Sequence, residues 1–247
     1  MKIFDKLKSL YGKFEDALFV EYSCICCGIE TNGSNKFLLC EKCFAGLEKI
    51  SGKVCKKCFS PLAGDYCFEC GKMNYSFDKN ISFYFYNDTT SKIIKNLKYH
   101  SNMTYAKYVA KMMTQNMNYF KDVDYLTFVP ISSERLKLRG YNQAEELARE
   151  ISKITQIEVV SLLSKDDGGK NQADLNMADR IENLKDCFHI KLADSERLKF
   201  KGKTIMIIDD VFTTGTTLSR CSHEIKKLRP KKIITMTLAK TKFDFSW

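Results

Sequence analysis

Short apolar runs alternate with stretches of helical spacing over most of the chain. Runs of strand length lie at 81–86, 125–129, 157–163, 204–208 and 232–238. Helical spacing of apolar residues covers 89–119, 142–154 and 216–228. Strands that alternate with helices indicate a parallel sheet joined by right-handed crossovers. The sequence therefore predicts an α/β fold, a parallel sheet flanked by helices, over residues 79–247.

The chain before residue 79 is organised differently. Apolar residues at helical spacing over 2–19 predict an amphipathic helix within 1–20, which we expect to dock on its own protein, with a membrane or partner surface as the alternative. Residues 21–75 are rich in cysteine and glycine and show little periodicity, so they need a metal ion in place of an apolar core. We place the boundary near 74–79 and expect a separate small module at 21–78.

Eight of the eleven cysteines fall in four CxxC pairs. The paired residues are Cys24, Cys27, Cys40, Cys43, Cys55, Cys58, Cys67 and Cys70. Two CxxC knuckles supply four thiolates in tetrahedral geometry, which is typical of structural zinc. The pairs predict one or two zinc ions in a zinc-ribbon-like module. Sequential pairing groups the first four and the last four cysteines, and crossed pairing stays open because spacing does not fix connectivity.

The remaining three cysteines and the absence of long apolar runs bear on the state of the thiols and on the location of the protein. Cys26 is an odd thiol that could replace a neighbouring ligand, and Cys187 and Cys221 are expected to be small buried hydrophobic residues. No apolar run reaches the roughly 20 residues that span a bilayer, and the N-terminus lacks the pattern of a signal peptide. We therefore expect reduced thiols and a cytoplasmic protein, with the inner face of the membrane as an alternative location.

The net charge of +10 favours a polyanionic partner without identifying one. Residues 1–78 hold 11 basic and 10 acidic side chains, so nearly all of the excess positive charge lies in 79–247. Four thiolates around one Zn²⁺ would add about two negative charges per site. The charge pattern thus assigns any polyanion mainly to the C-terminal part.

One segment carries clear candidate chemistry, T-I-M-I-I-D-D-V-F-T-T-G-T-T-L-S at 204–219. It predicts a strand over 204–208, a turn over 209–215 and then a helix. Ligands of open parallel sheets bind beyond the carboxyl ends of the strands, and N–H groups at a helix N-terminus bind phosphate. The competing interpretation is an ordinary strand, an acidic turn and a threonine N-cap.

As a whole, this segment resembles the signature of type I phosphoribosyltransferases, with a hydrophobic run, two acids and a T-T-G-T-T loop. The resemblance implies binding of phosphoribosyl pyrophosphate (PRPP) together with Mg²⁺. It implies that Asp209 and Asp210 contact the ribose hydroxyls. The 5′-phosphate would be held by Thr213, Thr214, Gly215, Thr216 and Thr217.

Two further segments resemble the ComF family of competence proteins. V-P-I-S-S-E-R-L-K-L-R-G-Y-N-Q-A-E-E-L-A at 129–148 is similar to the family's R-G-F-N-Q-A segment. K-N-Q-A-D-L-N-M-A-D-R-I-E-N-L at 170–184 is similar to its Q-x-x-L-x-x-x-x-R-x-x-N pattern, and Phe188 falls where its aromatic residue is expected. Paired CxxC motifs ahead of a phosphoribosyltransferase domain complete the resemblance, which implies a type I phosphoribosyltransferase fold behind the zinc module.

Basic residues just past a predicted strand end suit pyrophosphate or nucleic-acid contacts. They are Arg135, Lys137 and Arg139, with Lys170 as a further cation; a solvated helix start is the plainer interpretation. Asn142 and Gln143 are expected either to orient this loop or to cap a helix. Residues 166–169 are expected to form a lid or an ordinary surface loop.

The family's role in DNA uptake implies that aromatic side chains of the cysteine module stack on single-stranded DNA. The candidates are Phe37, Phe44, Phe59, Tyr66 and Phe68. The plainer interpretation is that zinc only holds the module together and shapes a hood near the active site. For the chain as a whole, the alternatives to handling of DNA are transfer of phosphoribosyl to an unidentified base or amine, and recruitment of helicase or membrane-associated competence proteins through the N-terminal helix. No acceptor pocket is recognisable, and His100, His189 and His223 show no catalytic pattern. Whether the chain catalyses a reaction therefore stays open.

Overall fold

The computed structural model of the chain describes residues 23–31, 35–62, 64–99, 103–166 and 188–242. The expected N-terminal helix, Lys170, His100 and Cys187 lie outside these residues, as do residues 167–169 of the expected lid. In the described part, no helix combines the length and the apolar character that a membrane crossing needs.

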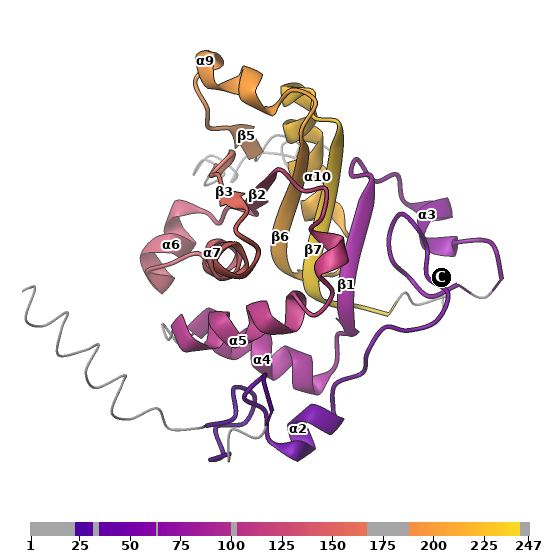
Figure 1. Ribbon diagram of the computed structural model, residues 1–247, viewed down its shortest axis with the longest axis vertical. Coiled ribbons are helices and arrows are strands. Elements are labelled where there is room, and N and C mark those ends of the chain that lie inside the picture. The colour runs from indigo at the N-terminus through magenta and orange to yellow at the C-terminus, as the bar shows by residue number, and fades with distance from the viewer. Residues whose placement is uncertain (1–22, 32–34, 63, 100–102, 167–187, 243–247) are drawn as a thin grey trace, which may run out of the picture.

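A five-stranded parallel sheet forms the centre of the molecule (Figure 1). Its strands, in spatial order, are β1 (Lys79–Phe85), β7 (Lys232–Lys240), β6 (Thr204–Phe212), β2 (Tyr125–Phe128) and β3 (Glu158–Val159). Since every strand pair is parallel, all carboxyl ends meet at one edge of the sheet. The predicted α/β fold is confirmed.

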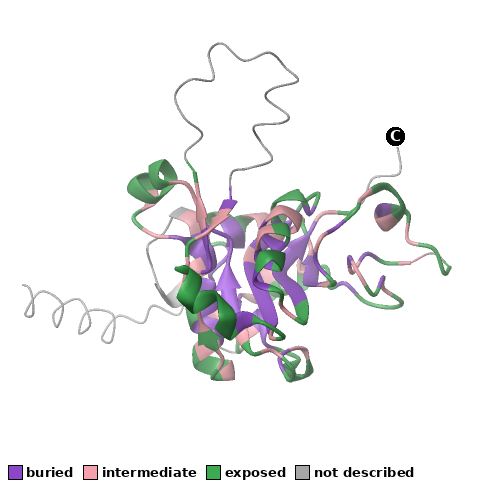
Figure 2. Ribbon diagram, turned by 90° about the horizontal axis from the view of Figure 1, so that it is seen from above, coloured by how far each residue is buried: buried purple, intermediate pink, exposed green. Residues whose placement is uncertain are grey.

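Helices cover both faces of the sheet because the central strands are apolar on both sides. In β6, Met206 and Ile208 pack toward one face and Ile205 and Ile207 toward the other. The first face is covered by α4 (Asp88–Tyr99), α5 (Met103–Met113) and α7 (Gln143–Thr155), and the second by α10 (Thr216–Ile225). Figure 2 shows the sheet as the buried interior, with exposed residues on the outer helices and loops.

Smaller elements surround this core. They are α2 (Glu41–Ala45), α3 (Phe68–Lys72), η1 (Met117–Tyr119), α6 (Ser133–Arg139), the antiparallel pair β4 (Leu163–Lys165) and β5 (Phe188–Ile190), α9 (Asp194–Arg197), η3 (Leu198–Phe200) and η4 (Lys226–Leu228). The apolar run at 157–163 was predicted as one strand, and this is wrong. Its start forms β3 in the main sheet, while its end begins β4 in a separate two-stranded antiparallel sheet.

The two halves of the cysteine-rich region occupy different places on the core. The half around α2 joins the α4 face, where the side-chain amide of Asn96 donates to Ile25 O at 3.0 Å. The half around α3 packs on the opposite face through Tyr75 and Phe77, which contact Phe212 of β6. Figure 1 shows α2 and α3 well apart.

Candidate functional site

The acidic pair lies within strand β6, not in the turn that the sequence predicted. β6 continues to Phe212, so the connecting turn is confined to Thr213, Thr214 and Gly215 before α10 begins. Hydrogen bonding with β7 extends this far because Val211 and Phe212 pair with Ala239 and Lys240. The acids are therefore fixed by sheet geometry.

The two acids have different surroundings. Asp210 is only 3% exposed, and its Oδ2 lies 2.7 Å from Lys98 Nζ and 3.5 Å from Gln143 Nε2. Asp209 is partly exposed, and its Oδ1 accepts a hydrogen bond from the Asp210 N–H at 2.9 Å. The charge of Asp210 is thus balanced by Lys98 on α4, whereas Asp209 keeps a carboxyl oxygen available to a ligand.

Although Asp209 is partly exposed, the surrounding protein desolvates its carboxyl group and raises its pKa to about 8, and the negative charge of Asp210 adds to the rise. Lys98 and Lys165 oppose it. At neutral pH Asp209 is therefore mainly protonated in the absence of a ligand, and an incoming cation or hydroxyl donor would favour its ionised form.

The loop after β6 has the form of an anion site. Thr213, Thr214, Thr216 and Thr217 are exposed, and the hydroxyls of Thr214 and Thr216 are 2.8 Å apart. Among the described residues, the backbone N–H groups of Gly215 and Thr217 have no acceptor. These donors stand at the N-terminus of α10, where the helix dipole adds favourable potential for an anion.

Gly215 is the N-cap of α10 and is required by both conformation and space. Its φ is +72°, in the left-handed region. A Cβ at this position would lie 2.4 Å from Phe212 Cζ and 2.7 Å from Tyr75 Cε1. The back of the loop is therefore closed by two aromatic rings.

The basic cluster lies on α6, which follows β2 and begins at the same edge of the sheet. Ser132 caps this helix by accepting from the Arg135 N–H, and Arg135 and Lys137 are exposed. Arg139 Nη1 donates to Gln143 Oε1 at 3.1 Å, and Gln143 in turn faces Asp210. Hydrogen bonds through Gln143 thus link Arg139 of α6 to Asp210 of the acidic pair.

Asn142 and Gln143 were expected either to cap a helix or to orient the neighbouring loop, and each has its own role. Asn142 caps α7 by accepting from the Ala144 N–H at 3.0 Å, and its amide donates to Val129 O at 3.0 Å. Gln143 bridges Arg139 and Asp210. Lys98 was missed as a functional residue because a lysine in a predicted helix gives no sign of a partner 112 positions away.

Each set of four cysteines converges in space. The first set is Cys24, Cys27, Cys40 and Cys43, and the second is Cys55, Cys58, Cys67 and Cys70, with all Sγ atoms of a set within 4.8 Å of one another. The sequential grouping is thereby observed. Cys26 is outside the first set, with its Sγ 3.7 Å from Thr89 O, and Cys221 is fully buried.

The thiol geometry fits a tetrahedral zinc ion. Four Zn–S bonds of about 2.3 Å require sulfurs roughly 3.8 Å apart. The Sγ atoms are 3.7 Å apart for Cys27 and Cys40 and 3.7 Å apart for Cys55 and Cys70. Burial raises the pKa of Cys58 to about 12, so a cation is needed to keep this thiolate ionised inside the cluster. Both clusters could therefore hold structural zinc.

The five aromatic candidates do not share one surface. Phe37 is buried at 4% exposure, so its prediction as a stacking face is wrong. Phe59 is half-buried against Tyr119. Tyr66 and Phe68 are exposed and pack edge to face at 5.0 Å. They line a cavity of about 350 Å³ between the second cluster and the ends of β1 and β7, whose wall includes Lys240. Phe44 is exposed on the other half.

The histidines carry no shared site among the described residues. His189 Nε2, on β5, lies 2.9 Å from Asp166 Oδ2 just after β4, and His223 is exposed on α10. Residue 166, the first position of the expected lid, is thus tied to β5.

The family model described as phosphoribosyl transferase domain matches residues 98–242, more than half of the chain. The chain belongs to the phosphoribosyl transferase family. The match begins at Lys98, the partner of Asp210, and ends just after β7, so it contains the acidic pair and the threonine loop.

Three relatives of this phosphoribosyl transferase chain are competence proteins. Competence protein F of Haemophilus influenzae is 27% identical over 235 residues, covering 90% of this chain and 98% of that protein. Competence protein ComFC of Streptococcus pneumoniae is 23% identical over 82% of this chain and 87% of its own. ComFC of Bacillus subtilis is 25% identical over 75% and 78%, respectively. The expected ComF resemblance is confirmed.

Proposed function

We propose that this ComF-type phosphoribosyl transferase chain binds PRPP at the carboxyl edge of β6 and single-stranded DNA during natural transformation. The observation that carries the proposal is the outward-facing threonine loop, with N–H groups of Gly215 and Thr217 that have no acceptor among the described residues. A partly exposed carboxylate and a basic helix flank this loop.

Each part of PRPP has a matching group at this edge. The 5′-phosphate would accept hydrogen bonds from the N–H groups and hydroxyls of residues 213–217. Asp209 would accept from the ribose hydroxyls, while Asp210, held by Lys98, fixes the direction of the strand end. The pyrophosphate would carry Mg²⁺, with Arg135, Lys137 and Arg139 as its protein contacts. Lys170 remains a further candidate outside the described residues.

Single-stranded DNA would contact both the basic domain and the aromatic pair of the second cluster. Tyr66 and Phe68 present exposed rings beside the cavity, which suits base stacking. The backbone would follow the positive charge of residues 79–247. Zinc in the second cysteine cluster would hold these rings in place. This arrangement favours a strand that lies close to bound PRPP.

The test is calorimetric titration of PRPP with Mg²⁺, repeated with a single-stranded oligonucleotide, together with DNA binding over a salt series. Replacing Arg135, Lys137 and Arg139 by glutamine should weaken both ligands and reduce the salt slope by about two, at about 0.7 per phosphate contact. The control removes the same charge at the amino ends of β6 and β7, in Lys201, Lys231 and Lys232. Equal effects of the two triple variants would contradict the proposal.

Transfer of phosphoribosyl to a base or amine is the second candidate, favoured by membership of the phosphoribosyl transferase family. The described residues would then act by positioning the sugar phosphate and neutralising the leaving pyrophosphate. Pyrophosphate release that requires an added acceptor would support transfer. Release that is absent across a broad panel of bases and amines would leave PRPP as a bound ligand only.

A further inference from the structure

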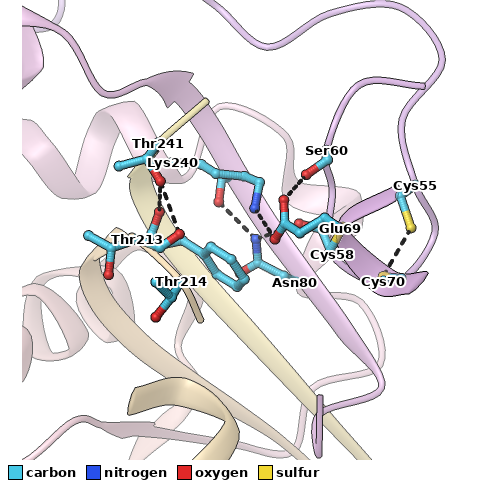
Figure 3. A network of polar contacts seen from close by, with 12 residues as sticks. Cys55, Cys58, Ser60, Glu69, Cys70, Asn80, Thr213, Thr214, Lys240 and Thr241 are labelled. Atoms are coloured by element: carbon cyan, nitrogen blue, oxygen red, sulfur yellow. Dashed lines mark hydrogen bonds and ion pairs between the residues drawn. The ribbon is translucent and has the colours of Figure 1, made fainter. Parts of the chain in front are cut away.

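A buried ion pair connects the second cysteine cluster to the main sheet. Glu69 lies on α3 between the ligands Cys67 and Cys70, and Lys240 ends β7. Glu69 Oε1 is 2.8 Å from Lys240 Nζ, with side-chain exposures of 4% and 1%. Figure 3 shows Glu69 between Ser60 and Lys240, close to the cysteines. Two charges in such a place are costly unless their remaining hydrogen-bonding capacity is used.

Glu69 uses both of its oxygens. The Ser60 hydroxyl donates to Oε2, and the Tyr75 hydroxyl donates to Oε1 at 2.7 Å. Ser60 also accepts through its backbone from the Cys55 N–H at 2.8 Å, within the knuckle that carries two of the thiols. The carboxylate is therefore fixed from the side of the cysteine cluster.

The other end of the network reaches the threonine loop of residues 213–217, the phosphate loop of the proposed site. Lys240 Nζ lies 3.7 Å from the centroid of the Phe212 ring, and Phe212 directly precedes the loop. Thr241 Oγ1 donates to Thr213 O at 3.0 Å, and the Thr241 N–H donates to Phe212 O at 2.9 Å. Figure 3 shows Thr213 and Thr214 beside Lys240 and Thr241.

Tyr75 contacts both Glu69 and the phosphate loop. Its hydroxyl is 2.7 Å from Glu69 Oε1 and 3.1 Å from Thr214 O, so one proton is shared between the carboxylate and the loop carbonyl. Its ring closes the space behind Gly215. The next residue, Ser76, donates its N–H to Ser219 Oγ of α10 at 2.9 Å.

A plain packing role does not account for this arrangement. Apolar residues of similar volume often stabilise a core at least as well as a buried ion pair, so the pair is weak evidence for stability alone. The first cysteine cluster is held differently, through backbone carbonyl groups that accept from Asn96 on α4. Of the two halves of the cysteine-rich region, the second is the one whose described residues contact the phosphate loop, through Tyr75.

We propose that Glu69, Tyr75 and Lys240 are positioning residues for the phosphate loop, which couples the second cysteine cluster to phosphoribosyl binding. The inference rests on the proposed PRPP site. Because coupling between two binding sites is reciprocal, an ordered second cluster raises PRPP affinity and bound PRPP protects the second cluster. The first cluster has no share in this coupling.

The first experiment compares Tyr75→Phe with Tyr84→Phe. Each change removes one buried hydroxyl without changing the ring, and Tyr84 accepts from Gln115 Nε2 at 2.9 Å on the far side of the sheet. We expect Tyr75→Phe to raise the PRPP Kd about fivefold, because the Thr214 carbonyl group loses the hydroxyl that holds the loop in place. Tyr84→Phe should leave Kd unchanged at a similar loss of stability. Equal Kd values for both variants and the unaltered protein would overturn the inference.

The second experiment uses the unaltered protein and needs no folded variant. Cysteine alkylation is followed residue by residue by mass spectrometry, with and without PRPP and Mg²⁺. PRPP should slow alkylation of Cys55, Cys58, Cys67 and Cys70 severalfold and leave the first cluster unchanged. Equal protection of both clusters, or protection of neither while calorimetry shows bound PRPP, refutes the coupling. Absence of calorimetric binding refutes the proposed function instead.

Discussion

Replacing Gly215 by alanine places a methyl group where two aromatic rings already lie. The left-handed φ of +72° costs an L-residue roughly 1–2 kcal/mol. The added Cβ would lie 2.4 Å from Phe212 and 2.7 Å from Tyr75, and Phe212 is fully buried beneath the Lys240 ammonium, so it has little room to move. Overpacking of this kind adds about 1–3 kcal/mol. We expect a total loss of roughly 2–5 kcal/mol in the free energy of unfolding.

Gly202 provides a matched control. It has the same φ of +72°, and a Cβ there would meet nothing within 4 Å. Gly202→Ala should therefore cost only the conformational part. Urea unfolding of both variants with unchanged m-values measures the difference, and PRPP titration should show weaker binding for Gly215→Ala alone. Equal losses of stability would mean that Tyr75 and Phe212 do not close the loop from behind.

Three further predictions concern other parts of the structure. Asp209→Asn should gain stability relative to the unaltered protein as pH rises from about 4 to about 8, by at most about 1.4 kcal/mol per pH unit, because the raised pKa makes ionisation unfavourable in the folded state. A pH-independent difference in unfolding free energy would contradict this. Asn142→Ala should lose about 1–2 kcal/mol in thermal unfolding, since it removes the α7 cap and the bond to Val129 O. Metal analysis should find two zinc ions per chain, one after Cys40→Ser and two after Cys26→Ser; a loss in the Cys26 variant would make that thiol a ligand.

The parts of this structure that are predictable from sequence are those that local patterns determine. Apolar runs that alternate with helical spacing specify a parallel sheet, and two acids followed by T-T-G-T-T at a strand end specify a strand, a loop and a helix N-terminus. Four CxxC pairs specify metal-type knuckles. Strand length was less predictable. Pairing of Val211 and Phe212 with β7 extends β6, and that pairing depends on residues elsewhere in the chain.

Contacts between distant positions could not be predicted. Glu69 and Lys240 are 171 residues apart, and nothing in the CxxC spacing indicates that the intervening glutamate faces the core. One local signal was present: Lys240 is a charged residue at the end of a nine-residue strand whose other buried positions are apolar or threonine. A lysine in such a place needs a buried partner. The sequence alone offers many carboxylates as candidates, and only the fold selects Glu69.

The acidic pair shows how strand geometry separates residues that sequence treats alike. Successive side chains of a strand point to opposite faces, so Asp209 and Asp210 cannot share one environment. Asp210 points to the face of α4 and α7, where Lys98 neutralises it and Gln143 links it to Arg139 of the basic helix. Asp209 points away from these partners and carries the raised pKa. A chain of hydrogen bonds therefore connects Arg139 on α6 to the buried Asp210, and Asp209 is the acid left to contact the sugar diol of the proposed ligand.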